Sequence, residues 1–173
     1  PQTCCLVVDA SIAGAAGALE SNDPAAVRCG DFLLVLRGLS YRMAWNAAIK
    51  AEWDQHQSNF AAAWLLTMAN LRKLRSVKDD PLEGLREAIR GHSQDQGVTK
   101  RMLKDSHLIE AALATDSRVA SGDENARGHF GRLAATHEPL QRIIWVNPVK
   151  EDEQAIGWLK AGAPLEGTRR LRP

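Results

Sequence analysis

Short apolar runs alternate along this chain with long stretches of helical periodicity, and this alternation constrains the fold more than any other feature. The clearest runs are residues 4–8, 118–120 and 143–146, and weaker ones lie at 41–45 and 75–77. Runs without polar alternation are typical of strands that are buried on both faces, as in parallel sheets. The sequence therefore predicts an α/β fold, a three-layer α/β/α sandwich with a central parallel sheet of four to five strands.

Helices are expected between the runs, because apolar residues recur there every three or four positions. The length of 173 residues fits a single domain over residues 1–173. A break is expected near Asp105, and a basic, flexible tail is expected from about residue 167. The predicted helices cover residues 24–39, 46–56, 59–73, 81–90, 99–115, 123–135 and 151–160.

The composition excludes several classes of protein. Apolar residues make up 45% and charged residues 25% of the chain, which is a globular mixture and not a disordered one. No apolar run approaches the roughly 20 residues of a membrane span. The three cysteines are an odd number, and Cys4 and Cys5 are adjacent, so no disulfide framework is indicated. We therefore expect a reduced, cytoplasmic protein that has no membrane partner.

The charge distribution is uneven although the net charge is only +1. Residues 71–104 carry nine Lys and Arg against five Asp and Glu. Lys100, Arg101 and Lys104 in this segment, and Arg127 further on, are weak candidates for contacts with nucleic-acid phosphates. The alternative is that these side chains form an ordinary solvated helix face.

Two acidic residues lie at the carboxyl ends of predicted strands. Asp9 follows the run 4–8, and Asp123 follows the run 118–120 after a Ser-Gly pair. The carboxyl ends of parallel strands share one edge of the sheet, and ligands bind in the crevice outside that edge. We therefore expect Asp9 and Asp123 to lie close together.

Two further acids lie on apolar stripes of predicted helices. Glu52 shares a stripe with Trp53, and Asp105 begins a row that continues through Leu108. A carboxylate on a buried face is costly unless it is paired or binds a cation. Glu110 falls off this row and is expected to be solvated.

Each acid also has a structural alternative. Asp9, Asp105 and Asp123 could cap helices, and Glu52 could pair with His56. If the four carboxylates converge, their mutual repulsion calls for a cation, and oxygen ligands suit Mg²⁺ or Mn²⁺. Such ions promote hydrolysis of phosphodiesters, so the residues favour cleavage of a nucleic-acid backbone.

The tryptophans and histidines indicate no further site. All five tryptophans lie at stripe or strand positions, which favours core packing over base stacking. Trp158, on the last predicted helix, is the best candidate for an exception. The five histidines are dispersed, without the spacing of zinc ligands.

Several short motifs, in order along the chain, resemble the PIN domain family. The motifs are residues 6–11 (LVVDAS), 50–53 (KAEW), 104–112 (KDSHLIEAA), 119–123 (VASGD) and 144–148 (IWVNP), the last matching the family's final strand.

The resemblance implies an α/β/α sandwich and a Mg²⁺- or Mn²⁺-dependent endoribonuclease. It implies that Asp9, Glu52, Asp105 and Asp123 are the catalytic and metal-binding quartet, supported by Ser11. Many family members are toxins of toxin–antitoxin pairs, so an antitoxin and a second copy of the chain are the candidate protein partners. This chain is longer than the commonest toxins between residues 64 and 99, and it ends in an extra helix.

Two other functions fit the same fold. The first is a catalytically inactive PIN-like module that binds nucleic acid or protein and whose acids only cap helices. The second is a receiver-like domain with Asp9 or Asp123 as phosphoacceptor, but Ala10 and the strand 143–146 supply neither the second acid nor the lysine that it requires.

Overall fold

A computed structural model describes residues 4–17 and 22–172 of the chain. It contains one sheet of five strands, all parallel, in the order β3-β2-β1-β4-β5. The strands are β1 (Cys5–Val8), β2 (Arg42–Trp45), β3 (Leu74–Ser76), β4 (Arg118–Ala120) and β5 (Ile144–Val146). The predicted α/β/α sandwich is confirmed; the weak run at 41–45 contains β2, and the run at 75–77 overlaps β3, which begins one residue earlier.

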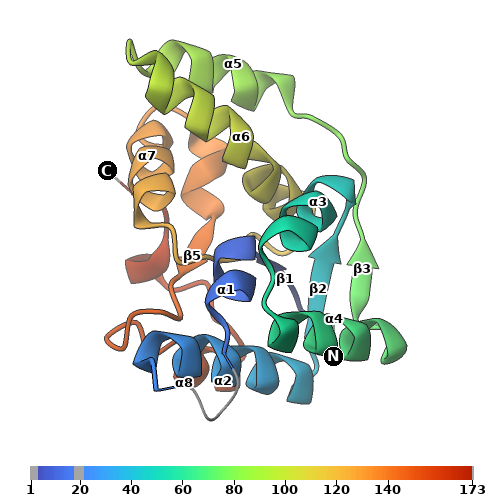
Figure 1. Cartoon of the computed structure of the whole chain (residues 1–173). Helices are drawn as coiled ribbons and strands as arrows, with labels where there is room; N and C mark the ends of the chain where they lie inside the picture. Colours follow the sequence, from blue (N-terminus) through green and yellow to red (C-terminus); the bar gives the residue numbers. More distant parts are fainter. Residues whose placement is uncertain (1–3, 18–21, 173) are drawn as a thin grey trace.

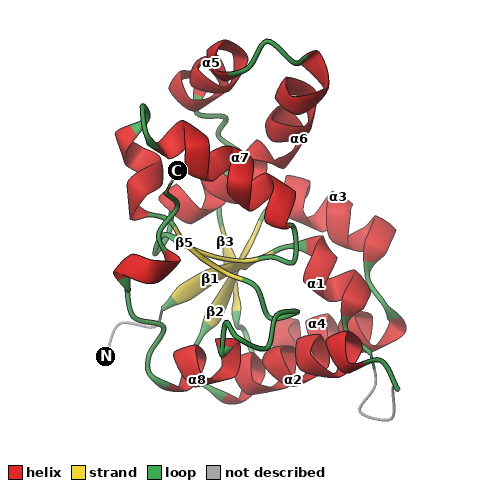
Figure 2. Ribbon diagram, turned by 90° about the vertical axis from the view of Figure 1, so that its left-hand side faces the viewer, coloured by secondary structure: helices red, strands yellow, loops and turns green. Residues whose placement is uncertain are grey.

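Helices cover both faces of the sheet. Figure 2 shows α2, α4 and α8 on one side and α6 and α7 on the other, with α5 packed outside α6. The short α1 and α3 stand near the carboxyl edge of the sheet, as Figure 1 also shows. The helices are α1 (Ala10–Ala15), α2 (Pro24–Gly38), α3 (Ala47–His56), α4 (Asn59–Asn70), α5 (Glu83–His92), α6 (Gln96–Leu113), α7 (Glu124–Ala134) and α8 (Ala155–Lys160). None of the helices in the described ranges is long and apolar enough to cross a membrane.

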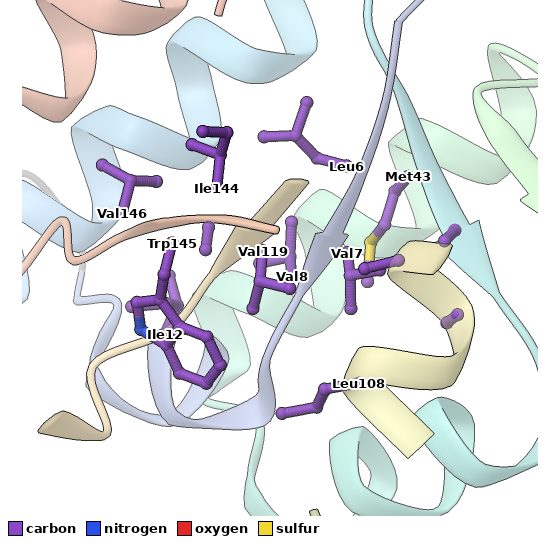
Figure 3. Packing of buried hydrophobic residues seen from close by; sticks show 14 of the residues in the cluster. Leu6, Val7, Val8, Ile12, Met43, Leu108, Val119, Ile144, Trp145 and Val146 are labelled. Atoms are coloured by element: carbon purple, nitrogen blue, oxygen red, sulfur yellow. The ribbon is translucent and has the colours of Figure 1, made fainter. Parts of the chain in front are cut away.

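The core is centred on β1, which is the middle strand. All four of its residues are fully buried, which explains why this run has no polar alternation. In Figure 3 the side chains of Leu6, Val7 and Val8 lie between those of the neighbouring strands, represented by Val119 and Met43. Burial on both faces is the reason that the sequence pattern identified this strand.

The strand order reverses between β1 and β4. The chain moves outward from β1 to β2 and β3, and then returns to place β4 on the other side of β1. Val8 pairs with Ala120, and the backbone N–H of Asp9 donates to the carbonyl of Ala120 at 2.9 Å. The residues that follow β1 and β4 therefore emerge side by side at the topological switch point, where ligands bind in open α/β sheets.

Helix α6 is continuous, so the predicted break near Asp105 is wrong. The helix begins three residues earlier than predicted, because Asp95 is its N-cap and accepts hydrogen bonds from the N–H groups of Gly97 and Val98. Asp105 therefore lies in the interior of α6 and cannot be a helix cap.

Two helices begin later than predicted. Helix α5 starts at Glu83 rather than at residue 81, and α8 starts at Ala155 rather than at 151. Gln154, just before α8, has a left-handed backbone with φ of 46°, which ends the preceding turn before the helix starts.

The C-terminal segment from residue 167 is packed, which corrects the expectation of a flexible tail. Leu171 is buried, and its backbone N–H donates to the carbonyl of Ile143 at 3.0 Å. A Cβ at Gly131 would lie only 2.4 Å from the carbonyl oxygen of Arg172, so the segment passes directly over α7. Residue 173, the last of the predicted tail, lies outside the described residues.

Two other expectations about exposure are wrong. Trp158 is buried, and its indole N–H donates to the carbonyl of Pro164 at 3.0 Å, so it cannot stack on a base. Glu110 is also buried and accepts two hydrogen bonds from Arg86, at 2.8 and 3.1 Å. Helix α5 covers this face of α6, and the periodicity of α6 alone could not show that.

Candidate functional site

All four acids that the sequence singles out line one cavity, which we call the acidic pocket. It lies at the carboxyl edge of the sheet and has a volume of about 360 Å³. Its lining residues are contributed mainly by α1, α3, α6 and the start of α7. The polar lining residues are Asp9, Ser11, Glu52, His56, Lys104, Asp105 and Asp123.

Asp9 is held by two hydroxyl groups. Its Oδ2 accepts hydrogen bonds from Ser11 Oγ at 2.5 Å and from Ser121 Oγ at 2.7 Å. The backbone N–H groups of Gly122 and Asp123 in turn donate to Ser11 Oγ and Ser121 Oγ, both at 3.0 Å. Asp9 occupies the N-cap position of α1 but its side chain makes no capping bond, so capping does not explain it. The network instead joins the segments that follow β1 and β4.

Glu52 reaches the pocket because its neighbour anchors α3 to the sheet. Trp53 is fully buried, and its Nε1 donates to the carbonyl of Val8 at 2.9 Å, beside Asp9. Glu52 Oε2 lies 3.4 Å from Lys104 Nζ and 3.6 Å from His56 Nε2. The contact with His56 that the structural alternative proposed is therefore present, together with a contact to Lys104 across the pocket.

Among the side chains that line the acidic pocket, the carboxyl group of Asp105 has the most strongly shifted pKa. Burial, followed by the nearby carboxylates of Asp123 and Asp9, raises its pKa from 3.8 to about 6, although Lys104 opposes the shift. Among the described residues, no group donates a hydrogen bond to its side chain. The repulsion shows that three of the four carboxylates are close enough to interact through their charges.

Asp123 has two roles in the structure. Its Oδ1 accepts a hydrogen bond from the N–H of Ala126 at 2.8 Å, so it caps α7 as the structural alternative proposed. It also lines the acidic pocket and contributes to the pKa shift of Asp105. Capping uses one carboxylate oxygen and leaves the other.

The four basic candidates are placed differently. Lys104 lines the acidic pocket, whereas Lys100 and Arg101 are exposed on α6. Arg127 forms an ion pair with Glu153, on the turn before α8, and its side chain is only 20% exposed. The guanidinium of Arg127 is therefore occupied by a carboxylate of the chain itself.

Sequence reasoning missed two polar residues at the same edge, Ser121 and Asn147. Both are buried, and each comes directly after a strand, as Asp9 does. Asn147 Nδ2 donates to Glu124 Oε1 at 2.9 Å. Burial disfavours the charge of Glu124, but hydrogen bonds from Asn147 and Lys150 outweigh burial and lower its pKa. The rule that found Asp9 could have found both residues, because each is a polar residue that ends a buried run.

The donors in the acidic pocket suit a hard cation. Most of them are carboxylate and hydroxyl oxygens; His56 adds an imidazole nitrogen, and no cysteine lines the pocket within the described ranges. Burial is the main cause of the raised pKa of Asp105, and a cation would offset both this cost and the added repulsion from Asp123 and Asp9. In residues 4–17 and 22–172, however, no three His, Cys, Asp or Glu side chains lie close enough together to chelate one ion as they stand. Binding would therefore require the carboxylates to turn inward from the pocket walls.

Comparisons with protein-family models, with curated proteins and with solved structures find no match to this chain.

Proposed function

We propose that this protein is a Mg²⁺- or Mn²⁺-dependent endoribonuclease of the PIN-like kind, with Asp9, Glu52, Asp105 and Asp123 as its catalytic and metal-binding residues. One observation carries the proposal: four acids that are far apart in the sequence line a single pocket at the topological switch point. Carboxylates that repel one another cost stability, so their grouping argues for a ligand of opposite charge.

The chain's own groups suit this chemistry. Ser11 and Ser121 both donate to Oδ2 of Asp9, which fixes the carboxylate and leaves Oδ1 without a partner among the described residues. A bound divalent cation would polarise the phosphodiester and lower the pKa of the attacking water. Lys104 neutralises part of the charge of Glu52 and can attract the substrate's phosphate.

An RNA cleavage assay tests the proposal. We expect a labelled single-stranded RNA to be cut with Mg²⁺ or Mn²⁺ and to remain intact with EDTA. Asp9→Asn and Glu52→Gln should each lower the rate by at least about 100-fold, as removal of one essential electrostatic group commonly does. The matched control is Asp54→Asn, because Asp54 is an exposed acid on the same helix as Glu52 and pairs with Lys50. Cleavage that persists in EDTA and in Asp9→Asn would refute the proposal.

The second candidate function is a catalytically inactive PIN-like module that binds nucleic acid or protein. The contacts of Glu52 with Lys104 and of Asp123 with the first turn of α7 favour it, because both acids already have partners. It predicts that the chain binds RNA or a protein but takes up no Mn²⁺ in a calorimetric titration. Stoichiometric uptake of Mn²⁺ that is lost in Asp9→Asn would exclude it.

A toxin role, an antitoxin and a homodimer are the parts of the proposal that rest on the family resemblance alone, whereas the cytoplasmic location rests on the cysteine content. Their first test is the oligomeric state of the purified chain by light scattering, together with growth arrest on expression. We expect any growth arrest to disappear with Asp9→Asn.

A further inference from the structure

Four basic or titratable side chains converge beside the acidic pocket from three helices. His92 ends α5, Arg101 lies on α6, and His129 and Arg132 lie on α7. The three helices pack against one another. Arg132 Nη2 lies 2.7 Å from Nδ1 of His129, and a guanidinium can only donate, so Nδ1 is the acceptor. We call these four residues the basic cluster.

The basic cluster lies next to the acidic pocket, on the same faces of α6 and α7 that line it. Arg101 lies four residues before Asp105 on α6, which is about 6 Å along the helix axis on the same face. On α7, Ala126 lines the pocket, and His129 and Arg132 follow at successive steps of three residues. Helix α6 leads away from the pocket in the direction of its own N-terminus, and α7 leads away in the direction of its own C-terminus. Arg101 on α6 and the pair His129 and Arg132 on α7 therefore lie on the same side of the pocket.

The basic cluster brings the positive charges of Arg101 and Arg132 close to His129. Burial lowers the pKa of His129, and Arg132, Arg101 and His92 lower it further, whereas Asp123 opposes them. In residues 4–17 and 22–172, no carboxylate lies within ion-pair distance of Arg101 or Arg132. By contrast, Arg86 and Arg90 on the neighbouring α5 are both paired. Like charges that gather without a partner suggest an external anion.

We propose that the basic cluster binds phosphate groups of a single-stranded nucleic-acid backbone and holds the strand on one side of the acidic pocket. The choice of this ligand rests on the proposed nuclease function. Arg101 and Arg132 offer guanidinium forks that match phosphate oxygens, and His129 offers its Nε2–H because its Nδ1 accepts from Arg132. These contacts are to the backbone, so they position a strand without selecting its sequence.

A binding measurement tests the proposal separately from cleavage. Fluorescence anisotropy would follow a labelled RNA oligonucleotide, and a DNA oligonucleotide of matching sequence, on the Asp9→Asn chain between 50 and 200 mM salt. Adding Arg101→Ala and Arg132→Ala should weaken binding of both strands by at least about tenfold at the lowest salt. It should also reduce the slope of log affinity against log salt by about 1.4, because each lost single-strand phosphate contact removes about 0.7.

The matched control removes the same charge elsewhere. Arg42, at the opposite end of the sheet, and Arg142, before β5, are both exposed and unpaired among the described residues. Arg42→Ala with Arg142→Ala should change the affinity by less than about twofold and leave the salt slope unchanged. A single reversal, Arg101→Glu, should weaken binding by at least tenfold with an unchanged thermal midpoint, since this side chain is exposed.

Each outcome separates the two proposals. If the chain cuts RNA but the Arg101 and Arg132 variant binds like its parent, or loses no more than the control, the cluster proposal fails and the nuclease proposal stands. If the chain cuts no RNA but its binding depends on Arg101 and Arg132, the cluster proposal stands alone. If polyglutamate binds with the same affinity and salt slope as RNA, the proposal of a nucleic-acid ligand is overturned in favour of an acidic protein partner.

Discussion

Asp105 occupies the interior of α6 with its carboxyl group partly buried beside Asp9 and Asp123. Nothing in the helix requires an acid at this position. The raised pKa means that the ionised carboxylate destabilises the folded state. Residues that destabilise a fold in this way are concentrated at functional sites. Asp105 is therefore the residue whose pH dependence tells most about the acidic pocket.

We expect Asp105→Asn to stabilise the protein at neutral pH. The folded state holds this proton more tightly than the unfolded state, because the pKa rises from 3.8 to about 6. Stability is therefore lost as the pH rises from about 4 to 6 and stays lower above it. After allowance for partial exposure, the substitution should raise the free energy of unfolding by about 1–2 kcal/mol at pH 7 and by almost nothing at pH 4. Urea denaturation at both pH values, without divalent cations, measures this; an equal effect at both would contradict it.

At the residue scale, the sequence identified the acids but not the groups that orient them. Asp9 and Glu52 stood out because a carboxylate after a buried strand or on an apolar stripe is costly. Ser121 and Asn147 occupy equivalent strand-end positions, but small polar residues are so common in turns that they did not stand out. Their role depends on the pairing of β1, β4 and β5, which no local pattern contains.

At the scale of elements, helix α3 shows how a buried side chain positions an acid. Trp53 is fixed by its hydrogen bond to Val8 and by stacking on Trp64, with ring centroids 5.9 Å apart. Glu52 is the preceding residue, so its direction follows from that anchor. The apolar stripe predicted the buried face of α3, but only the structure shows that the face ends at the acidic pocket.

We expect Trp53→Phe to cost more stability than Trp145→Phe. Both indoles are fully buried, but Trp53 Nε1 donates to Val8 whereas Trp145 Nε1 has no acceptor within the described ranges. Losing the bond and leaving a buried carbonyl unpaired should add about 1–2 kcal/mol to the cost of the smaller ring. Chemical denaturation of the two variants makes the comparison. Equal costs would show that the bond does not hold α3 in place.

The strands and most helices could be predicted because their signals are local, whereas the failures came from contacts across the chain. Helix α6 is an exception, because the local cap at Asp95 sets its earlier start, and the helix continues through Asp105 without interruption. Glu110 was expected in solvent, but α5 returns to cover it and supplies Arg86. The segment after residue 167 carries no element signal, and it is held by β5 and α7 instead.

At the scale of the whole molecule, the proposed cation should act as a stabilising ligand of the folded state alone. A concentration 100 times the dissociation constant adds about 2.7 kcal/mol, which corresponds to a rise in thermal midpoint of about 5–10 °C for a chain of this size. Thermal unfolding at pH 7.5 with Mn²⁺ measures the rise. The rise in thermal midpoint should be smaller in Asp9→Asn, and it should also be smaller below pH 6, where Asp105 is protonated. An unchanged midpoint for the wild-type chain would support the inactive module.

The junction between β1 and β4 joins a strand from the start of the chain to one formed more than a hundred residues later. The first three strands can associate as soon as residue 76 is available, but β1 then presents an unpaired inner edge. Asp9 and Glu52 are already present at that stage, while Ser121 and Asp123 are not. A nascent or prematurely terminated copy therefore lacks an assembled pocket, and its open edge exposes it to aggregation and proteolysis. All four acids are therefore present only after residue 123 has been synthesised.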